Sequence, residues 1–270
     1  MVELPGTEKR LEMSTLSKAT KLSEKRPPLR TCLFGPPGGG KTKLACTAPK
    51  PLLLDVEGGA ITLDNHPELL AAVDVLQVPN FDTVMDVIFE FREETADSKK
   101  YETVVVDTGT ELQAILLSDI LRKKHSKDEN RNPYAAQQLD YKENTEMLRR
   151  MIVAFRDLSV NFIIVAHDIT DKDGDDGKIY TRPAFTPKLA GTVKGLMDVQ
   201  AYLTADTDQE GEVVRRLQVH PANNIQAKCR VGGLPVIIED PHFDMLIRAN
   251  AEDTQKAETT INTIEKEEAA

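Results

Sequence analysis

A glycine-rich octapeptide near the start of the chain constrains its fold more than any other feature. Residues 35–42 read Gly-Pro-Pro-Gly-Gly-Gly-Lys-Thr and fit the pattern G-x-x-x-x-G-K-[ST]. The apolar segment Leu29–Phe34 precedes them, and a helix is expected to begin near Lys41. A strand, a glycine-rich turn and a helix in this order gather backbone N–H groups around one point, where an anion can bind. The octapeptide therefore predicts a phosphate-binding loop at the edge of an α/β sheet.

The residue types of this loop assign roles to its positions. The expected nucleotide-binding residues are Gly35, Pro36, Pro37, Gly38, Gly39, Gly40, Lys41, Thr42 and Lys43. Lys41 is expected to reach the β- and γ-phosphates of ATP, and the Thr42 hydroxyl is expected to bind Mg²⁺. ATP and Mg²⁺ are therefore the expected cofactors. The alternative is a turn of proline and glycine that carries an incidental lysine.

The rest of the chain alternates between strand-like and helix-like segments. Apolar segments suited to buried strands are Pro51–Asp55, Val73–Val78, Thr103–Asp107 and Phe162–Ala166. Apolar residues at helical spacing lie between them in Phe81–Phe91, Leu112–Ile120 and Leu148–Phe155. Later strands are expected at Val199–Leu203, Glu212–His220 and Val236–Glu239, and a short helix at Phe243–Arg248. This alternation predicts an α/β fold with a mainly parallel, doubly wound sheet and helices on both faces.

Two carboxylates beside predicted strands are expected to complete the site. Asp107 ends a β-branched strand, as a Walker B aspartate does, and is expected to bind the metal; capping the next helix is an alternative and compatible role. Thr108 follows it, so no glutamate stands there to activate water. Glu57 is the expected base, because the carboxyl ends of parallel strands share one edge of the sheet. Asp55 is the second candidate base, and a solvent-facing turn is the alternative for Glu57.

Three further residues are candidates for contact with a γ-phosphate. His167 follows the strand Phe162–Ala166, where a neutral imidazole can bond the phosphate or the attacking water; a histidine satisfied by the backbone is the alternative. Lys228 and Arg230 alternate on one face of an extended segment. They are expected to reach the γ-phosphate of a neighbouring copy, which implies a homo-oligomer with ATP sites completed in trans. An exposed basic edge is the alternative.

These motifs together resemble those of the RecA-like ATPases, and among them the phage-encoded nucleotide-binding proteins that act as single-strand annealing ATPases. The resemblance runs from about Leu29 to Arg248. It implies a RecA-like P-loop NTPase core with Glu57 as the catalytic glutamate and His167 at the sensor position. Lys228 and Arg230 fall where KaiC-type and DnaB-type rings have a K-x-R finger. The segment between Lys41 and Pro51 is shorter than the corresponding RecA helix.

The resemblance also implies a function. We expect an ATPase, with hydrolysis stimulated by DNA, that acts on single-stranded DNA in phage recombination or annealing, with a single-strand-binding protein as a further partner. RecA-like proteins hold DNA on loops that correspond here to residues 122–135 and 168–192. The expected DNA-binding cations are Arg122, Lys123, Lys124, Lys127, Arg131, Arg182 and Lys188. Cations near an aromatic residue such as Tyr134 suit single-strand binding, whereas a solvated helix end is the alternative.

Two other functions remain open at this point. One is a nucleotide-switched remodelling protein, such as a helicase loader, that binds a protein partner. The other is a small-molecule P-loop kinase, against which the acidic segment 168–177 argues, because such a kinase needs a basic lid.

The charge is unevenly distributed along the chain. The formal net charge of −10 excludes a uniformly basic nucleic-acid coat. We expect a basic N-terminal arm over residues 1–28, the ATPase core over 29–250 and an acidic tail over 251–270. No apolar run approaches the ~18 residues of a membrane span, and no secretory signal or disulfide framework is expected. The expected location is the cytoplasm, that of the host if the chain is phage-encoded, without a membrane partner.

Overall fold

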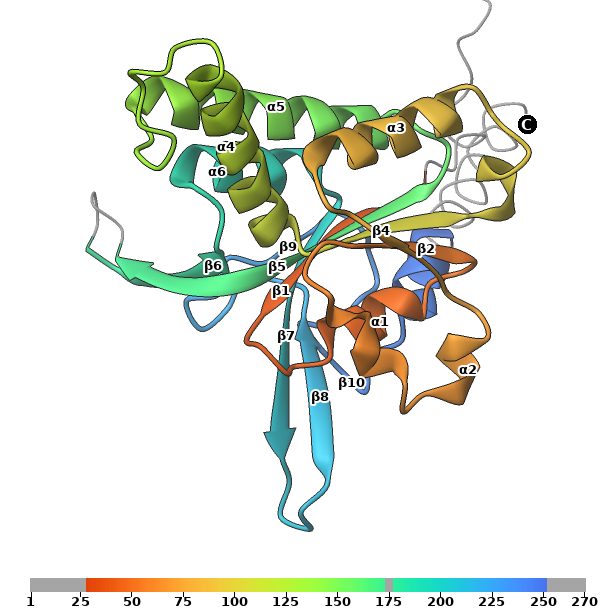
Figure 1. Cartoon of the computed structure of the whole chain (residues 1–270). Coiled ribbons are helices and arrows are strands. Elements are labelled where there is room, and N and C mark those ends of the chain that lie inside the picture. The colour runs from red at the N-terminus through yellow and green to blue at the C-terminus, as the bar shows by residue number, and fades with distance from the viewer. Residues whose placement is uncertain (1–27, 173–176, 252–270) are drawn as a thin grey trace, which may run out of the picture. The chain divides into compact units, whose positions relative to one another are not determined.

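A largely parallel sheet runs through the centre of the structure, which is a computed structural model that describes residues 28–172 and 177–251 (Figure 1). The strands are β1 (Arg30–Gly35), β2 (Pro51–Asp55), β3 (Asp74–Gln77), β4 (Thr103–Asp107), β5 (Asn161–Lys172), β6 (Ile179–Pro183), β7 (Val199–Thr207), β8 (Val213–Gln218), β9 (Lys228–Cys229) and β10 (Ile237–Glu239). The helices are α1 (Lys41–Cys46), α2 (Pro67–Leu70), α3 (Phe81–Arg92), α4 (Gly109–His125), α5 (Gln138–Arg156) and α6 (Pro187–Leu196). Short 3₁₀ turns are η3 (Gly59–Leu63) and η4 (Ser98–Lys100), and residues 243–251 are also helical.

The order of the strands decides which of them end next to the glycine-rich loop. The order is β10-β8-β7-β1-β5-β4-β2-β3, and the six strands from β7 to β3 are parallel to their neighbours. Strands β8 and β10 extend the sheet in antiparallel fashion beyond β7. Gly35 lies opposite His167, and Asp55 lies opposite Asp107. The expected α/β fold with a mainly parallel sheet is therefore confirmed, and its carboxyl edge gathers the predicted site.

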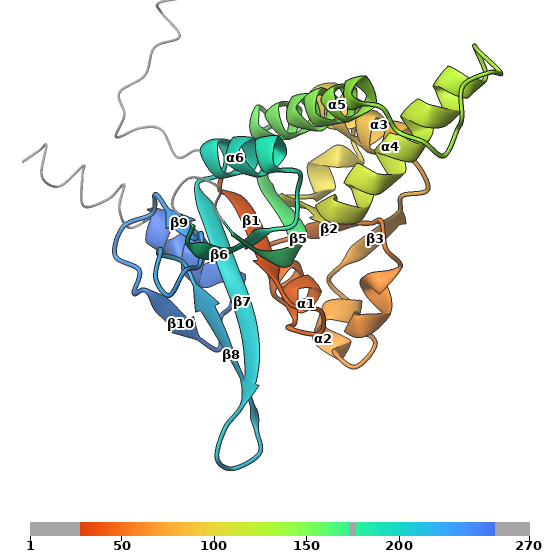
Figure 2. The same cartoon turned by 90° about the vertical axis from the view of Figure 1, so that its left-hand side faces the viewer.

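Helices cover both faces of this sheet, as the sequence predicts. Helices α3, α4, α5 and α6 pack on one face, and α1, α2 and the helical residues 243–251 pack on the other (Figures 1 and 2). Side chains alternate along each strand, so Val104 and Val106 belong to the first core and Val105 to the second. All three are fully buried. This two-sided burial explains why the strands read as unbroken apolar segments rather than as alternating ones.

Several elements run further than the sequence predicts: β5, α4, α5, which begins at Gln138 rather than near Leu148, and β7, which ends at Thr207 rather than at Leu203. Strand β5 continues past Ala166 to Lys172, because its second half leaves the main sheet and pairs with β6 in an antiparallel hairpin. Helix α4 continues through the basic residues to His125. Positive charges in the last turn of a helix interact favourably with the helix dipole, which helps to explain this extension.

Helix α1 is short, as expected. It ends at Cys46, three residues before Pro49, which cannot continue a helix. Apart from Pro28 and Ala251, the expected arm over 1–28 and tail over 251–270 lie outside the described residues, so both stay predictions. Within the described ranges, none of the helices combines the length and the apolar character that crossing a bilayer requires.

We expect Phe155→Ala to destabilise the fold strongly. Phe155 stacks on Phe162 with ring centroids 4.6 Å apart and an interplanar angle of 6°, and both rings are fully buried. Removing a buried aromatic ring lowers the free energy of unfolding by about 3–5 kcal/mol. Urea denaturation followed by circular dichroism measures the loss. Phe89→Ala is the matched control, because Phe89 is 54% exposed and should cost about 0.5 kcal/mol or less. Equal unfolding midpoints for the two variants would contradict the packing described here.

Candidate active site

The glycine-rich loop leaves β1 at the carboxyl edge of the sheet and leads into α1 (Figure 1). Gly40 has a φ of 90°, a left-handed conformation that favours glycine. A Cβ atom on Gly35 would lie 2.2 Å from the carbonyl oxygen of Leu203 in β7. Backbone therefore packs directly on backbone where the loop begins, and only glycine permits this approach.

Lys41 lies under the loop that it follows. Its side chain is 7% exposed, and its Nζ donates hydrogen bonds of 2.9 Å to the carbonyl oxygens of Gly35 and Pro36. Burial lowers the pKa of Lys41, while the charges of Asp107, Asp168 and Glu57 act against that shift. The Lys41 ammonium group thus lies at an edge of the sheet that also carries these three carboxylates. Lys43 follows in α1, with its side chain half-buried.

Thr42 and Asp107 are in direct contact. Thr42 Oγ1 donates a 2.6 Å hydrogen bond to Asp107 Oδ2, and Asp107 is 4% exposed. Burial raises the pKa of Asp107 to about 6, although the hydrogen bond from Thr42 acts to lower it. The charges of Glu57 and Asp55 add to the increase.

This hydroxyl and carboxylate fit a magnesium ion that arrives with a nucleotide. Magnesium prefers oxygen ligands, and in such sites it takes one or two from the protein and the rest from water and phosphates. Among the described residues, no group of three or more His, Cys, Asp or Glu side chains could hold a metal. Because they are in contact at the end of the loop, Thr42 and Asp107 are the residues that would hold Mg²⁺, with phosphates supplying further oxygens.

Glu57 lies between two polar partners at the same edge. Its Oε2 accepts a 3.2 Å hydrogen bond from Thr108 Oγ1 and lies 3.4 Å from His167 Nε2. The Glu57 side chain is still 42% exposed, so water reaches the carboxylate. On the other side of the imidazole ring, His167 Nδ1 is buried without a hydrogen-bond partner in the described part of the chain. The sequence-predicted base and sensor are thus neighbours, and this arrangement suits a carboxylate that takes a proton from water.

Asp55, the second candidate for the base, has a different role. Its oxygens accept hydrogen bonds from the backbone N–H groups of Gly58 and Gly59, at 2.8 and 3.0 Å, and from Gln77 Nε2, at 3.0 Å. A further bond of 3.3 Å comes from the N–H of Ala60, and Asp55 is 2% exposed. These bonds close the turn into η3 and leave Asp55 no access to water. The turn that they hold carries Glu57.

Two residues at this edge, Tyr202 and Asp168, are not predicted from the sequence as part of the site. Tyr202 of β7 donates a 3.2 Å hydrogen bond from its hydroxyl to Asp168 Oδ2, and its ring packs on Phe34 at 5.1 Å between centroids. Burial, together with the charge of Asp168, raises the pKa of Tyr202 to about 12. The position of Asp168 directly after His167 is a signal that could have identified it. Tyr202 offers no such signal, because it lies within an ordinary strand.

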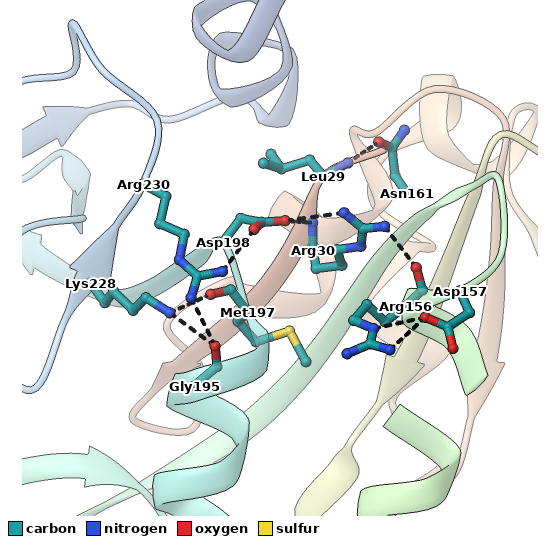
Figure 3. Close-up of polar contacts among 10 residues, drawn as sticks. All are labelled: Leu29, Arg30, Arg156, Asp157, Asn161, Gly195, Met197, Asp198, Lys228 and Arg230. Carbon is teal, nitrogen blue, oxygen red and sulfur yellow. Dashed lines mark hydrogen bonds and ion pairs between the residues drawn. The ribbon is translucent and has the colours of Figure 1, made fainter. Parts of the chain in front are cut away.

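Lys228 and Arg230 lie at the opposite edge of the sheet, where β1 and β7 begin (Figure 3). Lys228 Nζ donates to the carbonyl oxygens of Lys194 and Met197, at 2.5 and 2.7 Å. An Arg230 Nη atom donates to the Gly195 carbonyl at 3.0 Å, and another pairs with Asp198 at 3.4 Å. Both cations thus stabilise the carboxyl end of α6 within their own chain. Their action on a neighbour's phosphate stays a prediction, and it would require these bonds to break.

Most of the expected DNA-binding cations have acidic partners in the chain. Ion pairs join Arg122 to Asp119, Lys123 to Asp82, Lys124 to Asp140 and Glu143, Arg131 to Asp140, and Arg182 to Asp171. Within the described residues, Lys127 and Lys188 have no ion pair. Helix α4 begins beside Asp107 and has 17 residues, so the basic residues of its last turn lie about 25 Å away from its start. Five of the seven expected cations are therefore paired with acids, and those at the end of α4 are distant from the loop.

Comparison with known proteins agrees with this fold and this site. A family model described as an AAA domain matches residues 27–231, a stretch that runs from β1 to β9. No curated protein matches the chain. The matched range includes the glycine-rich loop, Glu57, Asp107 and His167. The match supports nucleotide binding and ATP hydrolysis as the general activity of the domain.

We expect Asp107→Asn to stabilise the protein at neutral pH in the presence of EDTA. The pKa of Asp107 rises from its ordinary 3.8 to about 6 on folding, so the folded state loses stability as the pH rises through this window. Each pKa unit is worth about 1.4 kcal/mol, so the neutral variant gains up to about 3 kcal/mol above pH 6. The gain should vanish below about pH 4.

Urea unfolding of both proteins between pH 4 and pH 7.5 measures this difference. Asp64→Asn is the control, because Asp64 is exposed on the surface and should give no pH-dependent gain. A gain from Asp107→Asn that is the same at every pH would show that charge burial is not its cause.

Proposed function

We propose that this chain, which belongs to the AAA domain family, is a magnesium-dependent ATPase in which Glu57 is the general base. The observation that carries the proposal is the position of Glu57, held by Thr108 and His167 at the edge where Thr42 bonds Asp107. A nucleotide in the glycine-rich loop brings its terminal phosphate to this edge. The reaction is attack of water on the γ-phosphate to give ADP and phosphate.

Each residue at the edge has a distinct task in this proposal. Glu57 orients the attacking water and accepts its proton, and the contacts to Thr108 and His167 fix the carboxylate. Lys41 and the loop N–H groups bind the phosphate oxygens, whose charge grows in the transition state. Thr42 and Asp107 would hold Mg²⁺, which would supply neutralisation of the phosphate charge. In this proposal His167, which contacts Glu57, responds to the water or the phosphate.

We propose further that the ATPase acts on single-stranded DNA, in recombination or annealing. The resemblance of the motifs to those of phage-encoded annealing ATPases supports this step, as do two cations without ion pairs in the described chain, Lys127 and Lys188. Tyr134, between them in sequence, is 93% exposed and offers a face on which a base can stack. A homo-oligomer, and a single-strand-binding protein as partner, belong to the same proposal.

One observation favours a second candidate function. Five of the seven expected DNA-binding cations are ion-paired within the chain, which reduces the charge available to phosphates. A nucleotide-switched remodelling protein of the helicase-loader type needs the same ATP site but little DNA affinity. The response of ATP hydrolysis to DNA separates the two functions.

Glu57→Gln should lower kcat for ATP hydrolysis about 10²–10⁴-fold, because the amide cannot take a proton from water. ATP affinity should stay within about twofold, since the side chain keeps its size and its hydrogen bond to Thr108. A phosphate-release assay and binding of a fluorescent ATP analogue give the two values. The control is Glu102→Gln, because Glu102 pairs with Lys50 on the surface and should leave both unchanged. Normal turnover by Glu57→Gln would remove Glu57 from the mechanism.

Single-stranded DNA should raise the rate of ATP hydrolysis by the wild-type protein. Combined Lys127→Ala and Lys188→Ala should reduce this stimulation and lower the salt dependence of DNA binding by about one unit of slope per lysine that contacts a phosphate. The basal ATPase rate should not change. The control is Lys99→Ala, because Lys99 pairs with Glu94 on the surface. A wild-type rate that is indifferent to DNA would favour the remodelling function instead.

A further inference from the structure

Arg215 of β8 lies against the last glycine of the loop. A Cβ atom on Gly40 would come within 2.6 Å of Arg215 Nε and within 3.3 Å of its Cδ, so the side chain passes directly over the glycine. Arg215 Nε is buried and has no hydrogen-bond partner in the described residues. No ion pair of Arg215 is found there either. Among the described residues, the guanidinium group of Arg215 therefore adjoins the phosphate-binding loop without an ion pair, and its Nε lacks a hydrogen-bond partner.

Arg216, the next residue of β8, does form ion pairs with acidic side chains. Arg216 forms ion pairs of 3.2 Å with Asp206 of β7 and with Glu239 of β10. Because side chains alternate along a strand, Arg216 points to the opposite face from Arg215. The acidic partners of Arg216 thus lie on the face of this strand that is turned away from Arg215.

An unpartnered buried donor is costly, because it has lost its bonds to water. A ligand that accepts a hydrogen bond at this position would remove that cost. The ligand of this loop is anionic, and a guanidinium group forms two parallel hydrogen bonds to a phosphate group. The hairpin of β7 and β8 is also held firmly, since the carbonyl oxygen of Leu203 in β7 packs on Gly35 of the loop. The strand that carries Arg215 is therefore held beside the loop.

We infer that Arg215 is a phosphate-binding residue, which donates hydrogen bonds to the polyphosphate chain of a nucleotide bound in the loop of the same chain. Together with Lys41 it gives the site a second cation, which balances the carboxylates at this edge. This inference rests on the proposed ATPase function and adds a residue that no sequence motif marks. It differs from a finger supplied by a neighbour, because Arg215 reaches the loop of its own chain.

Binding of a fluorescent ATP analogue to the full chain tests the inference, with inorganic triphosphate as competitor. Arg215→Ala should weaken both ligands about 10–100-fold, the loss expected when a charge-assisted hydrogen bond is removed. Arg215→Lys should recover part of this affinity, since it keeps the charge but not the fork of donors. Arg216→Ala is the matched control and should bind both ligands like the wild type. Melting temperatures of all variants identify any that fail to fold, and Arg215→Lys then carries the comparison.

Three results overturn the inference. Arg215→Ala and Arg215→Lys, both folded, bind ATP and triphosphate as tightly as the wild type. Arg215→Ala weakens ATP but not triphosphate, which would place Arg215 at the base or sugar. Arg216→Ala weakens triphosphate as much as Arg215→Ala, which would show a nonspecific effect of charge. If the wild-type protein itself binds no ATP, the proposed function fails, and this result is distinct from the other three.

Discussion

The hydrogen bond from Thr42 to Asp107 joins the two parts on which the site depends. Thr42 belongs to the helix that follows the glycine-rich loop, and Asp107 ends β4, which is separated from β1 by β5. The two side chains meet only because these strands are parallel and end at the same edge. Glu57 and His167 reach that edge for the same reason, from β2 and β5. The strand order thus determines which side chains meet at the site. The helices that pack on both faces of the sheet stabilise that order.

Electrostatic balance at this edge shapes the roles of its residues. Lys41 is buried close to three carboxylates, and each of them favours its charged form. Asp107 is 4% exposed, and its raised pKa reflects that burial. Asp55 is buried too, but backbone N–H groups donate hydrogen bonds to its side chain. In the proposed reaction, a nucleotide and its metal would enter a site whose charges are unequally compensated, where Asp107 can take a cation and Arg215 an anion.

Much of this arrangement is predictable from sequence, because it follows from local patterns. The buried strands are unbroken apolar segments, and the rule that parallel strands end together brings Glu57, Asp107 and His167 into one site. The rest depends on contacts between distant segments. Lys228 lies 34 residues from the carbonyl oxygen of Lys194 that it bonds, and the basic end of α4 meets Asp140 of α5. Arg215 belongs to an antiparallel strand without a motif, so only the fold places it beside Gly40.

Strand β5 belongs to two parts of the molecule. Its first half is held between β1 and β4, and its second half forms the hairpin with β6, with His167 at the junction. One backbone segment therefore joins the sheet that holds the loop to the hairpin outside it, and His167 is the residue at which it passes from one to the other.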